Sequence, residues 1–133
     1  QMPVYSASTI QAVLPMLEKA TSKEGTAPLA RIAGYRVAGK TGTAKKLVGA
    51  AYADGRYVAS YVGLAPVSNP RYVVAVMVDE PAGSMFYGGQ VAAPIFASVM
   101  SQTLRLLEVP YDAPLPTQPL PGDLTVAIVR EGN

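Results

Sequence analysis

The fold and the chemistry of this chain are decided by the stretch Tyr35-Arg36-Val37-Ala38-Gly39-Lys40-Thr41-Gly42-Thr43-Ala44. Its first four residues include β-formers without helical spacing, which predicts a strand. Side chains alternate along a strand, so Thr41 and Thr43 share one face, about 7 Å apart, while Lys40 and Gly42 share the other. Two hydroxyls beside an ammonium group suit a carboxylate ligand and a carbonyl oxygen that becomes negative during acyl transfer.

The same residues also satisfy a nucleotide-binding pattern. Gly34–Thr41 matches the Walker A spelling G-x-x-x-x-G-K-[ST], and Val73–Glu80 is similar to a Walker B strand. A phosphate-binding loop needs successive backbone N–H groups curled around the anion and followed by a helix. Here the loop positions are Tyr, Arg, Val and Ala, which prefer a strand, and Gly42 and Gly49 discourage the helix. A P-loop nucleotide-binding protein is therefore the weaker alternative.

The composition of the chain further narrows the classes of protein to which it could belong. The chain has 133 residues, is half hydrophobic and carries a net charge of only +2, which gives no electrostatic case for nucleic acid. Residues 25–53 nevertheless contain no Asp or Glu. This segment either raises the potential for an anionic substrate or forms a solvated basic face. Its cations are Arg31, Arg36, Lys40, Lys45 and Lys46.

Absent residue types exclude several kinds of site. The chain has no cysteine and no histidine, so disulfides, a Ser-His-Asp triad and His-Cys metal sites are impossible within it. The adjacent carboxylates Asp79 and Glu80 are interpreted as surface charges at the end of a strand, and no metal or cofactor is expected. There is no export signal and no apolar run of 18 residues, so we expect a fragment whose membrane anchor lies elsewhere.

A helix is predicted over residues 6–23, capped by Ser8 or Thr9 and stopped by Gly25. Pro15 interrupts it, which predicts a kink or a helix that begins near this residue. Apolar residues at helical spacing predict a buried stripe. The stripe consists of Ile10, Val13, Leu14, Leu17 and Ala20.

Strands are predicted over residues 57–65 and 72–78, separated by the short turn 66–70. Residues 45–56 are expected to connect the first strand to the second, with the turn at Asp54-Gly55. The close succession of these strands predicts an antiparallel meander, and the short turn 66–70 leaves no room for a parallel return, which needs a crossover of a dozen or more residues. The expected fold class is α+β, with an antiparallel meander flanked by helices.

Residues 82–90 form an irregular loop in which the pair Phe86-Tyr87 precedes two glycines. These rings either shape an apolar surface at the mouth of a cleft or pin the loop to the core. A second helix is predicted over 91–107, with Pro94 in its first turn. Its apolar face is expected to consist of Val91, Ile95, Val99, Leu104 and Leu107, flanked by Phe96, Met100 and Leu106.

The C-terminal segment differs in composition. Five of its residues between 110 and 121 are prolines, which predicts an extended, non-helical tail. Residues 124–129 could add a short edge strand. We therefore divide the chain into a domain fragment at residues 1–109 and a tail at 110–133.

Several short motifs follow one another along the chain. They are Gly25-Thr26-Ala27, Gly34 to Ala44, Val62-Gly63-x-Ala65-Pro66, Pro70-Arg71, Val78-x-Glu80-Pro81, Tyr87-Gly88-Gly89 and Ala93-Pro94-x-Phe96. In this order they closely resemble the C-terminal part of the transpeptidase domain of class B penicillin-binding proteins, over roughly residues 5 to 108. Thr43-Ala44-Lys45-Lys46 resembles the septal, cell-division type. The fold implied is that of the serine β-lactamases and penicillin-binding transpeptidases.

The resemblance implies a D,D-transpeptidase that cross-links peptidoglycan. A serine of the family attacks the penultimate carbonyl of a D-Ala-D-Ala stem peptide, expels D-alanine and passes the acyl group to an amine on a neighbouring stem. β-Lactam antibiotics trap the same serine. The implied setting is the periplasmic side of the bacterial inner membrane, with cell-division proteins as partners, no nucleic acid and no cofactor.

The resemblance also assigns roles. Lys40 would support the proton-transfer network, the Thr41 and Thr43 hydroxyls would hold the substrate carboxylate, and the Thr43 backbone N–H would be an oxyanion donor. Such a donor is worth about 3 kcal/mol in the barrier. The implied catalytic residues are Lys40 and Thr43, and the implied substrate-binding residues are Lys40, Thr41, Gly42, Thr43, Phe86 and Tyr87.

Two elements of the family are missing from this chain. Neither S-x-x-K, which supplies the nucleophile and its base, nor S-x-N occurs, and Ser68-Asn69 lacks the intervening residue. The chain by itself is therefore expected to be inactive, with the serine on an upstream segment of the same protein. A non-catalytic binding domain of the same fold stays open as a third alternative.

Overall fold

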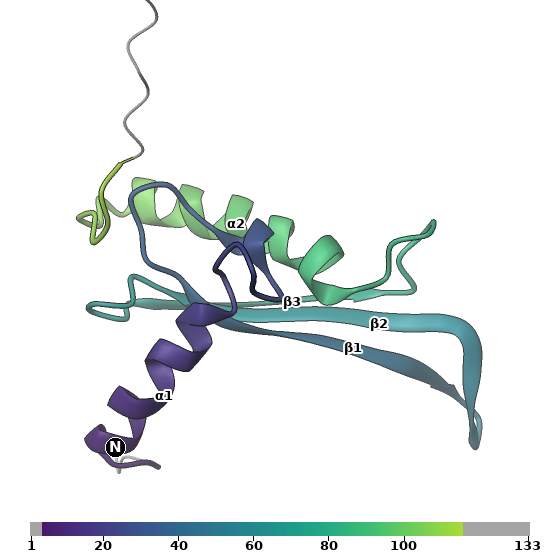
Figure 1. The fold of residues 1–133 in the computed structure, drawn as a ribbon. Coiled ribbons are helices and arrows are strands. Elements are labelled where there is room, and N and C mark those ends of the chain that lie inside the picture. The colour runs from purple at the N-terminus through teal and green to yellow at the C-terminus, as the bar shows by residue number, and fades with distance from the viewer. Residues whose placement is uncertain (1–3, 116–133) are drawn as a thin grey trace, which may run out of the picture.

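The computed structural model describes residues 4–115, which form one three-stranded antiparallel sheet with a helix on each side (Figure 1). This confirms the α+β prediction and the meander. The elements follow in the order α1 (Ala7–Lys19), η1 (Pro28–Ala30), β1 (Ala38–Val48), β2 (Ala51–Ala65), β3 (Tyr72–Asp79) and α2 (Gly88–Leu106).

The central strand of the sheet is β2. It pairs with β1 through Lys40–Val62 and with β3 through Val62–Ala75, so these three residues lie in one row across the sheet. Strand β3 pairs only with residues 58–65 of β2. Residues 44–57 therefore continue as a two-stranded ribbon, here called the hairpin arm, which extends past the end of β3 (Figure 1).

The predicted connection over residues 45–56 is wrong. Strand β1 continues to Val48, the chain reverses at Gly49-Ala50, and β2 starts at Ala51. The register moves from Lys45–Tyr57 to Leu47–Tyr52, which leaves residues 53–56 as a bulge. Gly55 has a φ of +73° within that bulge, so the turn tendency of Asp54-Gly55 bends a strand instead of ending it.

Helix α2 covers the face of the sheet that contains Tyr61, and this contact forms the core. A ridge of α2 residues spaced four apart is buried against the strands. Phe96 packs edge-on against Tyr61, with ring centroids 4.8 Å apart. The buried ridge consists of Ala92, Phe96, Met100 and Leu104.

The prediction of the apolar face of this helix is therefore correct for Leu104 and for the flanking residues Phe96 and Met100, and wrong for Ile95 and Val99. Ile95 and Val99 are each 44% exposed, whereas the small residues Ala92 and Ala93 are fully buried. The predicted face consisted mainly of bulky side chains. The small side chains of the alanines let the helix approach the sheet closely. Helix α2 also begins at Gly88, which places Pro94 in the second turn.

Helix α1 departs from its prediction in three ways. Its N-cap is Ser6, whose hydroxyl accepts the Thr9 N–H at 3.2 Å, and not Ser8 or Thr9. It continues through Pro15 and ends at Lys19. None of its residues is buried, because α1 contacts β1 alone and projects from the side of the sheet opposite α2 (Figure 1).

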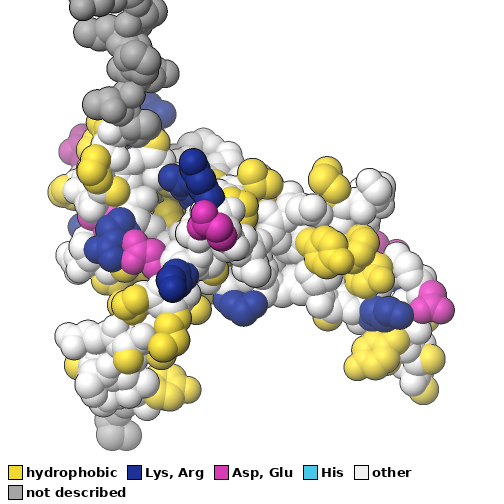
Figure 2. Space-filling view, viewed as in Figure 1, with side chains coloured by type: hydrophobic (Ala, Val, Ile, Leu, Met, Phe, Trp, Pro, Cys, Tyr) yellow, Lys and Arg dark blue, Asp and Glu magenta, His cyan; other side chains and the backbone are white. Residues whose placement is uncertain are grey.

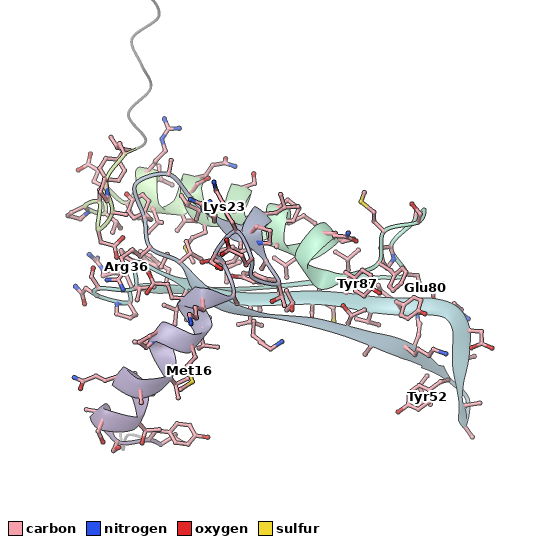
Figure 3. All side chains as sticks on the ribbon, in the orientation of Figure 1. Met16, Lys23, Arg36, Tyr52, Glu80 and Tyr87 are labelled. Carbon is pink, nitrogen blue, oxygen red and sulfur yellow. The ribbon has the colours of Figure 1, made fainter. Side chains whose placement is uncertain are left out.

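An apolar surface is left on that side of the sheet. Val62, Val73 and Met77 are 47%, 68% and 74% exposed there, and Met16 of α1 is 68% exposed (Figure 3). Nothing among residues 4–115 covers this uncovered face. Contiguous apolar surfaces of this kind mark a contact with another segment or molecule.

We predict that this chain, produced by itself, does not fold as a stable monomer, because the uncovered face would remain in water. Size-exclusion chromatography and thermal unfolding followed by circular dichroism would test this. We expect self-association or a broad transition, and a sharp, cooperative transition of a monomer would contradict it.

The prediction of an edge strand at 124–129 falls outside the described residues. Residues 110–115 are non-helical, as expected, and they pack against the segment before β1. The division of the chain at residue 109 stays a prediction.

Candidate active site

Four of the six predicted site residues, Lys40 to Thr43, lie on β1, an edge strand, and the other two, Phe86 and Tyr87, lie in the loop before α2. Among the residues that the structure describes, β1 pairs with β2 on one side and with no strand on the other. Lys40 is exposed, and its Nζ donates a hydrogen bond to the carbonyl oxygen of Thr41 at 2.9 Å. The segment Lys40–Thr43 is thus presented along an open edge, where another segment carrying a nucleophile could approach it.

Both threonines lie at the N-terminus of α2, which confirms that they share one face. The backbone N–H of Gly88 donates to Thr43 Oγ1 at 3.0 Å. Thr41 Oγ1 lies 3.4 Å from Thr26 Oγ1. A hydroxyl that accepts one hydrogen bond keeps its own proton for donation, so Thr43 can still donate to an anion. The positive end of the α2 dipole favours negative charge at this position.

Two glycines allow the N-terminus of α2 to pack closely against β1. A Cβ on Gly88 would lie 2.2 Å from the Ser60 carbonyl oxygen and 2.5 Å from that of Gly42. A Cβ on Gly89 would lie 2.0 Å from the carbonyl oxygen of Thr26. The sequence indicated a glycine pair beside aromatics, but its contacts with Ser60 and Thr26 depend on the tertiary packing.

The aromatic pair forms a small cluster with a third ring. Phe86 stacks on Tyr57 of β2 with centroids 4.2 Å apart, and Tyr87 lies 4.5 Å from Phe86. Phe86 is half-buried, which fits the interpretation that it pins the loop. Tyr87 is 57% exposed and lies over the part of the sheet nearer the hairpin arm (Figure 3), where hydrophobic side chains gather on the surface (Figure 2). Tyr57 was not singled out from the sequence, because its partner is 29 residues away in the chain.

Three of the five cations in the basic segment are paired. Arg36 contacts Glu18 at 2.6 Å, Lys45 contacts Asp54 at 3.0 Å, and Lys46 contacts Asp79 and Glu80 at 2.6 Å each. Lys40 has no carboxylate partner within residues 4–115. Arg31 has no carboxylate partner there either, but it lies outside β1, so Lys40 is the unpaired cation on β1 within the described residues.

Glu80 joins the hairpin arm to the end of β3. Arg56 and Lys46 both contact its carboxylate and lower its pKa from 4.5 to about 2. A lowered folded-state pKa contributes stability above the unfolded value, and that contribution disappears as the pH falls through the folded value. Asp79 shares Lys46, so both strand-end carboxylates act as ion-pair partners at the surface.

We predict that the melting temperature of the complete protein falls less steeply between pH 4.5 and pH 2 when Glu80 is replaced by glutamine. At neutral pH the variant should be less stable than the parent, because the ion pairs with Arg56 and Lys46 are lost. Differential scanning calorimetry over this range is the measurement, with Glu24→Gln as the control. Parallel pH profiles for the parent and Glu80→Gln would contradict the prediction.

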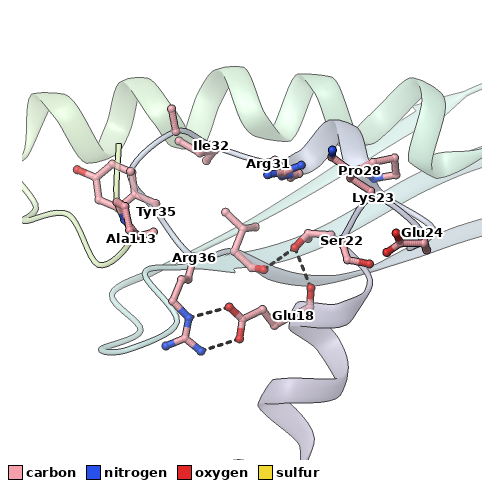
Figure 4. A pocket seen from close by; sticks show the side chains of 15 residues that line it. Glu18, Ser22, Lys23, Glu24, Pro28, Arg31, Ile32, Tyr35, Arg36 and Ala113 are labelled. Carbon is pink, nitrogen blue, oxygen red and sulfur yellow. Dashed lines mark hydrogen bonds and ion pairs between the residues drawn. The ribbon is translucent and has the colours of Figure 1, made fainter. Parts of the chain in front are cut away.

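A hollow in the described part of the chain lies beside the residues that precede β1. It has a volume of about 870 Å³ and is lined by residues of segments 18–37 and 113–114, but not by Lys40, Thr41 or Thr43 (Figure 4). Among the described residues there is also no cluster of His, Cys, Asp and Glu that could hold a metal ion. The candidate site is therefore an open strand edge.

The P-loop alternative is wrong. Gly39, Lys40 and Thr41 lie inside a strand that continues to Val48, and no helix follows them. The Walker B-like segment is β3, which runs antiparallel to β2 in a meander. Successive N–H groups of a strand point in opposite directions, so they cannot surround one phosphate.

Comparison with known proteins gives the same answer as the geometry. The family model of the penicillin-binding protein transpeptidase domain matches residues 1–101. A probable peptidoglycan D,D-transpeptidase PenA of Neisseria flavescens is 42% identical, over 94% of this chain and 30% of that protein. The peptidoglycan D,D-transpeptidase FtsI of Escherichia coli K12 is 38% identical, over 98% of this chain and 21% of that protein.

Solved structures agree in fold. The transpeptidase domain of penicillin-binding protein 3 from Burkholderia pseudomallei superimposes with a TM-score of 0.75 at 50% identity, covering 84% of this chain and 34% of that one. Penicillin-binding protein 3 from Mycobacterium tuberculosis, in complex with ampicillin, gives a TM-score of 0.73 at 37% identity, covering 88% and 28%.

The chain thus spans between about a fifth and a third of the length of these relatives. The match extends over the strand that bears Lys40 and over most of α2. The sequence motifs, the sheet topology and the family model all indicate the same family. The chain belongs to the penicillin-binding protein transpeptidase domain family.

Proposed function

We propose that the complete protein is a peptidoglycan D,D-transpeptidase, and that this chain supplies its substrate-binding strand. The observation that carries the proposal is the open edge of β1, where the two threonine side chains lie beside the N-terminus of α2 and Lys40 lies on the opposite face of the same strand. The relatives named above bear the same activity in their names.

In the proposed reaction, a serine on a segment outside this chain attacks the penultimate carbonyl carbon of a D-Ala-D-Ala stem peptide. The oxygen of that carbonyl becomes negative, and the Thr43 backbone N–H donates to it. The Thr41 and Thr43 hydroxyls donate to the terminal carboxylate of the donor peptide. Lys40 supplies a positive charge on the same strand and supports proton transfer from the serine.

The tetrahedral intermediate then collapses: the carbonyl re-forms, the bond to the terminal D-alanine nitrogen breaks, and D-alanine leaves after taking up the proton from the serine, which gives the acyl-enzyme. An amine of a second stem peptide then resolves the acyl-enzyme. The amine nitrogen forms a bond to the acyl carbon, the serine oxygen leaves and takes up a proton, and the cross-link is complete. β-Lactams would acylate the same serine. Tyr87, with its exposed ring beside the N-terminus of α2, is proposed to contact the acyl side chain of a substrate or drug, and Phe86 to support it.

The proposed setting is the periplasmic side of the bacterial inner membrane during cell division, with cell-division proteins as partners. It rests on the septal type of the Thr43-Ala44-Lys45-Lys46 motif and on the relatives named FtsI. In the part of the chain that the structure describes, no helix has the length and apolar character needed to cross a bilayer.

Labelling of the complete protein with a fluorescent penicillin tests the proposal. We expect one covalent label per molecule, blocked by prior incubation with unlabelled ampicillin. A protein that folds but takes up no label would favour the non-catalytic alternative. Sequencing the upstream segment gives an independent check, since S-x-x-K should be found there.

A further inference from the structure

The segment that leads into β1 is held through its backbone by a carboxylate far away in sequence. Asp112 Oδ1 accepts the Arg36 N–H at 2.7 Å, and Asp112 Oδ2 accepts the Ser68 N–H at 3.1 Å. The Val67 N–H donates to the Arg36 carbonyl oxygen at 3.1 Å. One carboxylate thus joins the start of β1 to the turn between β2 and β3.

Arg36 is also bound from the side of α1, through its side chain. The Arg36 guanidinium donates two hydrogen bonds to Glu18, at 2.7 and 2.6 Å (Figure 4). The buried Thr21 hydroxyl lies 2.9 Å from the carbonyl oxygen of Val37. Four parts of the chain therefore meet at Arg36. They are α1, the residues that precede β1, the turn at 66–68 and the segment that contains Asp112.

Asp112 belongs to segment 109–115, here called the strap, which contacts the residues that precede β1. The N–H groups of Asp112 and Ala113 donate to the Gly34 carbonyl oxygen at 3.2 and 3.1 Å. The Tyr35 hydroxyl donates to the Val109 carbonyl oxygen, and the Tyr35 ring lies 5.0 Å from that of Tyr111. The strap and the residues that precede β1 thus pack together over several residues.

An edge strand needs such support. Strand β1 is hydrogen-bonded to β2 on one side only in the described part of the chain, and its open side carries the candidate site. Lys40 lies four residues after Arg36, which is about 13 Å along an extended strand. Hydrogen bonds to both the N–H and the carbonyl oxygen of Arg36 limit rotation and lateral shift of the backbone at the start of β1. Pairing with β2 alone does not prevent these movements.

We propose that Asp112 is a positioning residue for the Lys40–Thr43 segment. It acts through the backbone of Arg36 and touches no substrate. This inference rests on the proposed transpeptidase function, because it assigns the strap a part in aligning the strand that binds the substrate. Misplacement of a binding group by about 1 Å can cost on the order of a hundredfold in rate.

The test compares Asp112→Asn with Asp112→Ala and a control, Glu108→Gln, in the complete protein. Asparagine keeps the shape but offers only one acceptor oxygen, so one backbone N–H loses its partner. Glu108 lies in the same region, is exposed, and its side chain makes no hydrogen bond with any described residue. The control therefore removes one negative charge without touching Arg36.

The readout is the time course of labelling by a fluorescent penicillin well below the melting temperature. We expect the acylation rate constant to fall about tenfold or more for both Asp112 variants, with complete labelling at the end point. A structural role would instead lower the labelled fraction at an unchanged rate constant. That result, an unchanged time course, or failure of even Asp112→Asn to fold would overturn the proposal.

A second measurement is independent of activity. Amide hydrogen exchange over residues 38–43 should be faster in Asp112→Asn than in the parent, and unchanged in Glu108→Gln. If the parent takes up no penicillin, the proposed function fails, while this exchange difference still decides whether Asp112 holds the strand. Equal exchange in all three proteins would contradict the inference.

Discussion

Replacing Lys40 by alanine in the complete protein is expected to abolish detectable labelling by a fluorescent penicillin. Lys40 is the one cation of β1 without a carboxylate partner among residues 4–115, and it lies on the strand that carries the two threonine hydroxyls. Loss of one electrostatic group of this kind typically lowers the rate by about 100-fold to 1,000-fold. The measurement is the acylation rate constant under saturating penicillin.

Lys45→Ala is the matched control for this variant. Lys45 lies on the same strand, but it is paired with Asp54 on the hairpin arm, and exposed ion pairs contribute little. Its acylation rate should stay within about twofold of the parent. Equal rates in Lys40→Ala and the parent would remove Lys40 from the site.

Replacing Gly88 by alanine is expected to have the largest effect on stability. Its Cβ would lie 2.2 and 2.5 Å from two backbone carbonyl oxygens, those of Ser60 and Gly42, and neither can rotate away. Helix α2 would have to move from the sheet, which also breaks the hydrogen bond from Gly88 to Thr43. We expect a loss of about 3 kcal/mol or more in the free energy of unfolding of the complete protein.

The matched control is Gly55→Ala in the hairpin arm. Nothing lies within 4 Å of a Cβ at Gly55, so only its φ of +73° opposes the change. That backbone strain costs about 1 kcal/mol. Denaturant unfolding of both variants gives the comparison, and similar losses in the two would contradict the close seating of α2 on β1.

Several features could be predicted from local sequence alone. Short connections between apolar runs dictated an antiparallel meander, and alternation placed Thr41 and Thr43 on one face. The helix faces could not be predicted in the same way. Ala92 and Ala93 carry little hydrophobic signal, yet their small size decides how α2 approaches the sheet. The hairpin reversal was missed because Gly49-Ala50 is a weaker turn signal than Asp54-Gly55.

The sequence by itself determined the family, the strand that carries Lys40, Thr41 and Thr43, and the absence of a serine nucleophile motif from this chain. Only the tertiary structure decided that the N-terminus of α2 rests on that strand and that Asp112 holds its start. Both depend on contacts between residues 45 and 76 positions apart. No local propensity encodes such contacts, because they arise from the way whole elements pack.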